Sequence, residues 1–232
     1  MGEVIRATAD PEEIVKDARH ALRKATDRGG EVAAAAKLRL EGPLTGVAAA
    51  ETEKNRAHEV VEAAISAALA IDTQEDVMLG TTRDEMHNTL GRPASSPALT
   101  AIFGGGLRTF TEAPLLDQHI FMSVLATRID AADAAPLQAR KVEWAQRVRD
   151  GADRHHRATE PVREAEALET VALAGHRAVA RSCHVGLTRL KRDLKSLEMT
   201  EAQIHEIIPD RPRPEPKGPA GGGPGGEASS GA

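Results

Sequence analysis

The sequence predicts an all-α protein, a bundle of four to five amphipathic helices with coiled-coil-like packing. Apolar and small residues recur at alternating spacings of three and four over long stretches, which is the period at which one helix contacts another. The apolar content comes mainly from Ala, Val, Leu and Ile, because the 232 residues include only three Phe, one Trp and no Tyr. The only alternation typical of strands covers residues 108–111 and is too short for a sheet.

The helices can be placed from their start and stop signals. Asp10 followed by Pro11 is a typical N-terminus, whereas Gly42-Pro43 predicts a stop. Gly80 and Gly91 are expected to end two short helices, and Pro161 to kink or restart a longer one. The expected helices cover residues 11–40 with an interruption at Gly29-Gly30, 45–71, 74–79, 83–90, about 111–129, 136–159 and 159–199, with a short amphipathic helix over 201–208.

Composition predicts one folded domain and a tail. Residues 1–208 are expected to form the helical bundle, with an irregular insert at 73–112 that contains the Pro- and Ser-rich loop 92–97. Residues 209–232 contain six Pro and seven Gly and no apolar side chain larger than Ala. Such a segment buries too little surface to offset its chain entropy, so we expect it to be disordered.

The longest heptad stripe lies in the predicted helix 159–199. Its first half is rich in small residues and is expected to lie in the core. Its second half is leucine-rich and can be either bundle core or a contact surface for a partner, and the flanking basic residues favour the contact surface. The stripe consists of Ala165, Leu168, Ala172, Gly175, Val179, Cys183, Leu187, Leu190, Leu194 and Leu197, and the predicted contact surface comprises Leu187, Leu190, Leu194 and Leu197 with Arg189 and Arg192.

Charge is unevenly distributed along the chain. Residues 41–90 carry ten acidic against three basic side chains, and residues 170–197 carry six basic against one acidic. We expect the two segments to neutralise each other within the chain, although the basic segment could instead face nucleic acid or a lipid surface. The scarcity of aromatic residues argues against base stacking. The expected partner is therefore a protein, most simply a second copy, with no specific nucleic acid.

Three Asp-x-x-His pairs are the candidates for metal binding, because residues three apart share a helix face. These pairs are Asp17/His20, Asp84/His87 and Asp153/His156. They resemble in part the Glu-x-x-His motif of di-iron helical bundles, and that resemblance implies a ferritin-like metal-binding bundle. The acids here are Asp instead of Glu, however, and the pairs lie off the apolar stripes. No cofactor is therefore expected.

Two buried positions and one flexible segment complete the candidates. His155 is expected to bond a carbonyl or a facing glutamate of the helix at 45–71, and Cys183 to be a small buried hydrophobe. The apolar segment 98–107 includes Ile102, Phe103, Gly104, Gly105 and Gly106. It is interpreted as a hinge or, alternatively, as a segment that inserts into a membrane edge.

No catalytic or nucleotide-binding motif occurs in the chain. The sequence therefore predicts a non-enzymatic structural, scaffold or adaptor protein that assembles through helix–helix contacts. The alternatives are a peripheral membrane or pore-forming protein and a metal-binding bundle. With one cysteine and no secretory signal, a cytoplasmic location is expected.

Overall fold

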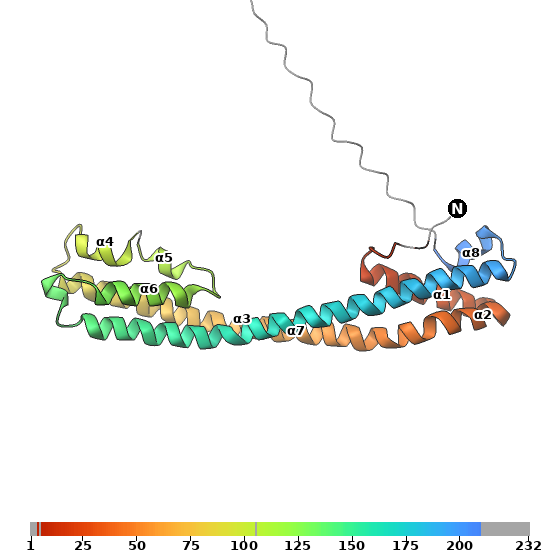
Figure 1. Cartoon of the computed structure of the whole chain (residues 1–232), viewed down its shortest axis with the longest axis horizontal. Coiled ribbons are helices and arrows are strands. Elements are labelled where there is room, and N and C mark those ends of the chain that lie inside the picture. Colours follow the sequence, from red (N-terminus) through yellow and green to blue (C-terminus); the bar gives the residue numbers. More distant parts are fainter. Residues whose placement is uncertain (1–3, 5, 105, 210–232) are drawn as a thin grey trace, which may run out of the picture. The chain divides into compact units, whose positions relative to one another are not determined.

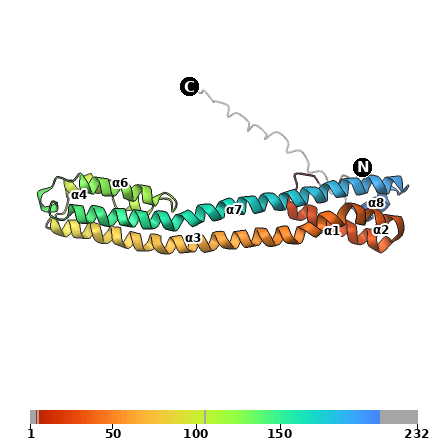
Figure 2. The same ribbon diagram turned by 60° about the horizontal axis from the view of Figure 1, so that its bottom comes forward.

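The computed structural model describes residues 4, 6–104 and 106–209, and it confirms the all-α prediction. The described residues form helices and no strand (Figures 1 and 2). In chain order the elements are α1 (Pro11–Arg28), α2 (Gly30–Ala36), the π-helix η1 (Lys37–Glu41), α3 (Gly42–Thr89), α4 (Pro97–Phe103), α5 (Arg108–Thr111), α6 (Gln118–Asp130), the 3₁₀-helix η2 (Ala135–Leu137), α7 (Lys141–Ser196) and α8 (Glu201–Ile207).

Several helix ends match their sequence signals. The Asp10 side chain caps α1 by accepting a hydrogen bond from the amide of Glu12, and Gly29 ends the helix with φ at 75°. Thr200 and Gln203 form a reciprocal capping box at the start of α8. These local signals involve only neighbouring residues, so the sequence alone predicts them.

The predicted breaks at 42–43 and 80 are wrong, because α3 is one helix of 48 residues. The chain enters α3 directly from the π-helix η1, and Pro43 lies at this junction, in the first turn of α3. Gly80 lies inside the helix, between the buried residues Leu79 and Thr82. Burial of that face against other helices outweighs the roughly 1 kcal/mol that glycine costs in a helix.

The predicted boundary at Pro161 is also wrong. Helix α7 runs for 56 residues with Pro161 inside it, and it begins at Lys141 instead of at Pro136. Thr159 lies at the expected start of the helix 159–199, but its hydroxyl donates to the backbone carbonyls of His155 and His156, at 3.1 and 3.0 Å, within one continuous helix. Pro161 is exposed, so its ring lies on the outer side of the helix and not in the core.

Contacts divide the chain into two compact units, so the expected single domain over 1–208 is described below as two. Unit 1 comprises residues 1–48 and 177–232, and unit 2 comprises residues 49–176. Because α3 and α7 are long, each contributes one part to each unit. Each unit also has its own cluster of buried apolar side chains.

The core of unit 1 is aliphatic. Helix α1 contacts α2, η1 and α8, and its buried face includes Ala18, Ala21 and Ala25. Against this face pack the leucines of α7 and the isoleucines of α8. Unit 1 contains no Phe, Tyr or Trp, so close approach of helix backbones through small residues fills the core instead of large rings.

The core of unit 2 holds the large side chains. Helices α4 and α5 pack on α6. The fully buried residues include Phe110, Met122 and Trp144, and the rings of Phe103 and Phe110 meet edge to face with centroids 6.2 Å apart. Helices α4 and α5 lie in the predicted irregular insert 73–112, but residues 73–89 of that insert are regular helix and form the last part of α3.

A charged cluster around Glu85 fastens α3 to the first turns of α7 in unit 2. The Glu85 carboxylate accepts hydrogen bonds from Trp144 Nε1 at 2.8 Å, Arg140 Nη2 at 2.9 Å and Arg147 Nη1 at 3.0 Å. The hydrogen bond from Trp144, followed by those from the arginines, lowers the pKa of Glu85. The acidic segment is thus neutralised in part by arginines of residues 140–154, whereas the sequence suggested residues 170–197 for this role.

Candidate functional site

The predicted contact leucines lie mostly in the core of unit 1. Leu187, Leu190 and Leu194 are completely buried, and Leu197 is half-buried. Leu187, Leu190 and Leu194 pack with residues of α1 and α8 in the core of the same unit, so these three are not available as an exposed surface for a partner. Of the two candidate readings of this leucine run, the structure supports bundle core.

In the first half of the predicted stripe, two residues that were expected in the core are exposed. Leu168 is 62% exposed and Gly175 is exposed, although both were expected in the core. Ala165 and Ala172 of the predicted stripe are buried or half-buried, but Glu169 and His176, each one residue further along, take the inward positions expected for Leu168 and Gly175. The buried or half-buried stripe of α7 in unit 2 is Val162, Ala165, Glu169, Ala172 and His176. One-residue displacement rotates a helix face by about 100°, which is enough to exchange core for surface.

This rotation leaves an exposed apolar band on α7. The exposed residues of the band are Ala167, Leu168, Val171, Ala174 and Gly175. Val171 is 70% exposed and Leu168 62%. Both are large apolar side chains one helical turn apart, and the band around them is not interrupted by a charged residue.

A similar band lies on α3 in the same unit. Its exposed residues are Val60, Ala63, Ser66, Ala67 and Ala70. Each of Val60, Ala67 and Ala70 precedes by one position a buried or half-buried residue of α3. The band on α3 is therefore displaced from the buried stripe in the same sense as the band on α7.

Two side-chain contacts fix how the helices align in unit 2. His58 Nδ1 lies 2.8 Å from Glu169 Oε1, and His155 Nε2 lies 3.2 Å from Asp72 Oδ1. The helices are thus antiparallel, with Val60 at the level of Leu168. In an antiparallel pair, equal displacements from the shared interface place both bands on the same side. We call the combined surface of these two exposed bands, which includes Val60 and Ala67 on α3 and Leu168, Val171 and Gly175 on α7, the apolar face.

The opposite side of this helix pair is polar. It follows the buried stripes by one residue and carries His58 and Glu62 on α3, and Arg163, Glu166 and Thr170 on α7. His58 contacts Glu62 and Glu169 there, and these carboxylates raise the pKa of the imidazole, the hydrogen bond to Glu169 being the larger cause. Leu69, 48% exposed, is the large exposed apolar residue of this side.

The predicted hinge or membrane segment is built into the core of unit 2. Ile102 and Phe103 are 1% and 3% exposed, and both lie in α4, which Ser96 caps. Gly104 and Gly106 have φ of +57° and +117°, so the turn after α4 needs glycine. Gly105 lies outside the described residues. Insertion into a membrane edge would need Ile102 and Phe103 to contact lipid. Because both side chains are buried in the core of unit 2, they cannot make that contact in this structure.

The Asp-x-x-His pairs do not converge. Asp17 is buried and His20 is partly buried in unit 1, whereas Asp153 and His156 are exposed in unit 2. His87 contacts the backbone carbonyl of Pro93 through Nε2 at 3.0 Å. Among the residues that the structure describes, no group of three His, Cys, Asp or Glu side chains is placed to hold a metal ion.

A histidine cluster in unit 2 was only partly predicted. His155 is fully buried and bonds Asp72 instead of a glutamate, while its Nδ1 has no hydrogen-bond partner among the described residues. The ring of His119, on α6, lies 6.3 Å from that of His155 and 4.7 Å from that of His156, between centroids. Nothing local in the sequence marks His119, because its neighbours come from another helix.

Burial is the main electrostatic influence on this cluster. It lowers the pKa of His119, and the nearby His156, Arg163 and His155 lower it further. Burial also raises the pKa of Asp76, with a further contribution from Asp72 and a hydrogen bond from Gln118 that opposes the change. These surroundings favour the neutral forms of His119 and Asp76.

Cys183 is buried, as expected, and burial raises the pKa of its thiol. A thiol in this setting is a poor nucleophile. His176 is also buried, with Nε2 unpaired among the described residues.

Comparison with protein families, curated proteins and solved structures found no match to this chain. Within the described ranges, no helix is both long and apolar enough to cross a bilayer. The apolar face is thus the feature that an account of function has to explain.

Proposed function

We propose that this chain is a non-enzymatic scaffold or adaptor that self-associates through the apolar face of unit 2. The observation that supports this most directly is the exposure of Leu168 and Val171, next to each other on one side of a two-helix segment. An amphipathic pair of helices with a second apolar side has an obvious packing solution, a four-helix arrangement with another pair.

The charges around the apolar face favour a second copy as the occupant. The exposed charged residues beside the bands are Glu53, Arg56 and Glu59 on α3, and Arg157, Glu160 and Glu164 on α7. Each copy thus presents arginines and glutamates on the same border, so the arginines of one copy can lie against the glutamates of the other. A partner of a single charge sign would meet like charges here.

The dimensions of the face predict a modest affinity. From the level of Gly175, which the alignment places opposite residue 52 of α3, to Ala70, the face spans about 27 Å at 1.5 Å per residue, and two adjacent helices are about 20 Å wide. The resulting area of about 540 Å² per copy is below the roughly 800 Å² of a standard interface. Self-association should therefore depend on concentration.

The experiment is the solution mass of the full chain, measured by sedimentation or light scattering from about 1 to about 100 μM. We expect the average mass to rise toward twice that of one chain. A mass that stays at one chain throughout this range would overturn the proposal.

A pair of variants locates the contact. Leu168→Glu combined with Val171→Glu places two like charges in the apolar face and should keep the chain monomeric. The matched control, Leu69→Glu, changes an exposed leucine on the polar side and should leave the mass unchanged. Loss of association in both, with normal helix content by circular dichroism, would mean that the contact is elsewhere.

A further inference from the structure

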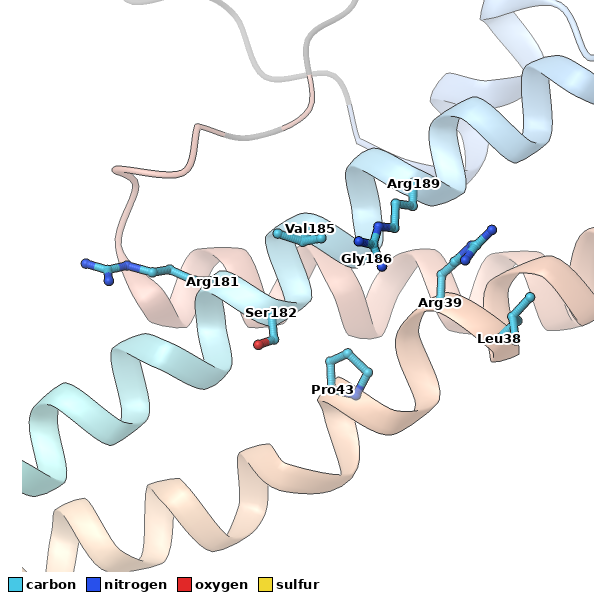
Figure 3. A pocket seen from close by; sticks show the side chains of 8 residues that line it. All are labelled: Leu38, Arg39, Pro43, Arg181, Ser182, Val185, Gly186 and Arg189. Carbon is cyan, nitrogen blue, oxygen red and sulfur yellow. The ribbon is translucent and has the colours of Figure 1, made fainter.

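Unit 1 contains a surface pocket of about 390 Å³ between two helical segments. One wall is formed by η1 and the first turn of α3, and the other by the facing turns of α7 (Figure 3). Its size lies within the range of small-molecule sites. The lining residues are Leu38, Arg39, Pro43, Arg181, Ser182, Val185, Gly186 and Arg189.

The pocket exists because the two walls meet very closely on one side. A Cβ atom on Gly186 would lie 2.5 Å from the carbonyl oxygen of Arg39 and 2.9 Å from Leu40 Cδ2. Glycine therefore allows the π-helix to rest on α7. A π-helical turn is a rare feature that is found disproportionately at functional sites, since it displaces side chains from the regular helical positions.

Two of the three arginines in the pocket have no partner within the part of the chain that the structure describes, residues 4, 6–104 and 106–209. Arg181 and Arg189 are exposed and form no ion pair or hydrogen bond with the described residues. Arg39 is different, because its Nε donates to Asp193 at 2.7 Å, and this hydrogen bond raises the pKa of the guanidinium. Arg39 is thus held in the wall, while the other two remain available to an anion.

The spacing of these two arginines suits a single anionic group. They are eight residues apart on α7, which is about 12 Å along the axis and close to the same side of the helix. Val185 lies midway between them. Long, flexible arginine side chains from both ends of the pocket can reach one group placed above Val185.

The remaining lining is apolar and accessible. Leu38 is 73% exposed and Val185 is 45% exposed, and Pro43 lies between the walls (Figure 3). Exposed leucine next to unpaired arginines suits a ligand that has both an anionic and an apolar part.

We propose that this pocket binds a phosphate group carried on a small organic body. Phosphate is favoured over a carboxylate because it carries more negative charge and offers oxygens to two guanidinium groups at once. The apolar wall of Leu38, Pro43 and Val185 contacts the carbon part. The phosphate can belong to a soluble phosphomonoester or to a phospholipid headgroup. The site lies in unit 1 and does not depend on the apolar face of unit 2.

The first experiment titrates the full chain with phenyl phosphate and with inorganic phosphate, using calorimetry. We expect saturable binding of phenyl phosphate, weakened at least tenfold in the double variant Arg181→Gln/Arg189→Gln. The matched control, Arg177→Gln/Arg192→Gln, removes the same charge from the same helix at exposed positions outside this pocket and should change affinity by less than about twofold. Equal losses in both variants, or no saturable binding of either the phosphate probes or vesicles, would overturn the proposal.

The second experiment identifies the apolar contribution and the source of the phosphate. Leu38→Ser should weaken phenyl phosphate without changing inorganic phosphate. Flotation with phosphatidylcholine vesicles, with and without phosphatidic acid, tests the headgroup. Binding to phosphatidic acid vesicles that needs Arg181 and Arg189 assigns the site to a lipid, whereas binding of phenyl phosphate alone assigns it to a soluble ester. Both support a phosphate site, and vesicle binding that the double variant retains would contradict it.

Discussion

The two units reach a buried core by different means. Unit 1 has no aromatic residue and brings helix backbones together through Ala18, Ala21, Ala25 and Gly186. Unit 2 buries Phe103, Phe110 and Trp144, and it also encloses polar groups that include Glu75, Gln118 and His155. A core built on close backbone approach should tolerate added volume poorly, whereas a core of rings and polar groups should be sensitive to deletion and to pH.

The chain provides one natural reporter for each unit. Trp144, the single tryptophan, is buried in unit 2, and Cys183, the single cysteine, is buried in unit 1. Tryptophan fluorescence therefore follows unfolding of unit 2. Reaction of the thiol with a colorimetric reagent follows the opening of unit 1, because the buried thiol is protected until then.

The largest effect is expected from deleting a ring in unit 2. Phe110→Ala leaves a cavity beside Phe103 and should destabilise the unit by about 3–5 kcal/mol. The fluorescence transition in urea should move to lower denaturant, while the protection of Cys183 in water stays the same. Parallel changes in both reporters would show that the units unfold as one, and the comparison between them would then fail.

Adding volume to the core of unit 1 should destabilise unit 1 and leave unit 2 unchanged. Gly186→Ala places a Cβ against the Arg39 carbonyl, and since backbone cannot move aside as a side chain can, we expect a loss of about 1–3 kcal/mol. Thiol reaction should become faster while the fluorescence transition is unchanged.

Gly151→Ala in unit 2 is the matched test of the same idea. Its Cβ would meet the ends of flexible side chains, Glu75 Oε2 at 2.4 Å and Met78 Cε at 2.6 Å. Because these ends can shift, Gly151→Ala should cost less than Gly186→Ala. A larger cost at Gly151 would contradict the distinction between the two cores.

Mild acid should weaken unit 2 through the histidine cluster. Because burial lowers the pKa of His119 in the folded state, its contribution to stability is complete above the unfolded pKa of about 6.5 and is lost as pH falls through the lower folded pKa. The raised pKa of Asp76 acts in the opposite sense, but in the more acidic range where carboxyl groups titrate. The urea concentration at the midpoint of the fluorescence transition should therefore decrease as the pH is lowered below about 6.5. The variant His119→Phe should make this decrease smaller.

His58 gives a comparison of opposite sign within unit 2. Its pKa is raised, mainly by the hydrogen bond to Glu169, so its stabilising contribution is complete below the unfolded pKa and lost as pH rises through the folded pKa. His58→Gln should therefore steepen the loss of stability on acidification. If both histidine variants changed the pH profile in the same direction, the assigned environments would be wrong.

Sequence reasoning predicted what depends on neighbouring residues. The helical class, the cap at Asp10 and the short helix at 201–208 all follow from spacing and local hydrogen bonds. The breaks at Gly80 and Pro161 were wrong, because contacts with distant helices determine whether a helix continues through a weak residue.

The spacing of apolar residues could not predict the apolar face, because it does not determine which of two stripes of α7 faces α3. In α7 of unit 2 the stripes through Leu168 and through Glu169 have similar periods, and hydrophobicity favours the first. Glu169 nevertheless takes the position facing α3, where its carboxylate contacts His58, and Leu168 turns outward. The partner that decides this lies 111 residues away in the chain, so a local pattern could not reveal the apolar face.

The smallest expected effect tests that outward rotation directly. Gly175 was predicted to lie in the core, where close packing would require glycine, but a Cβ added there meets nothing within 4 Å. Gly175→Ala should therefore stabilise the chain by about 0.5–1 kcal/mol, since alanine is the better helix former. The thermal transition by circular dichroism should rise slightly at low protein concentration. Destabilisation at low concentration would mean that Gly175 is buried, and the apolar face would then be misplaced by one helical position.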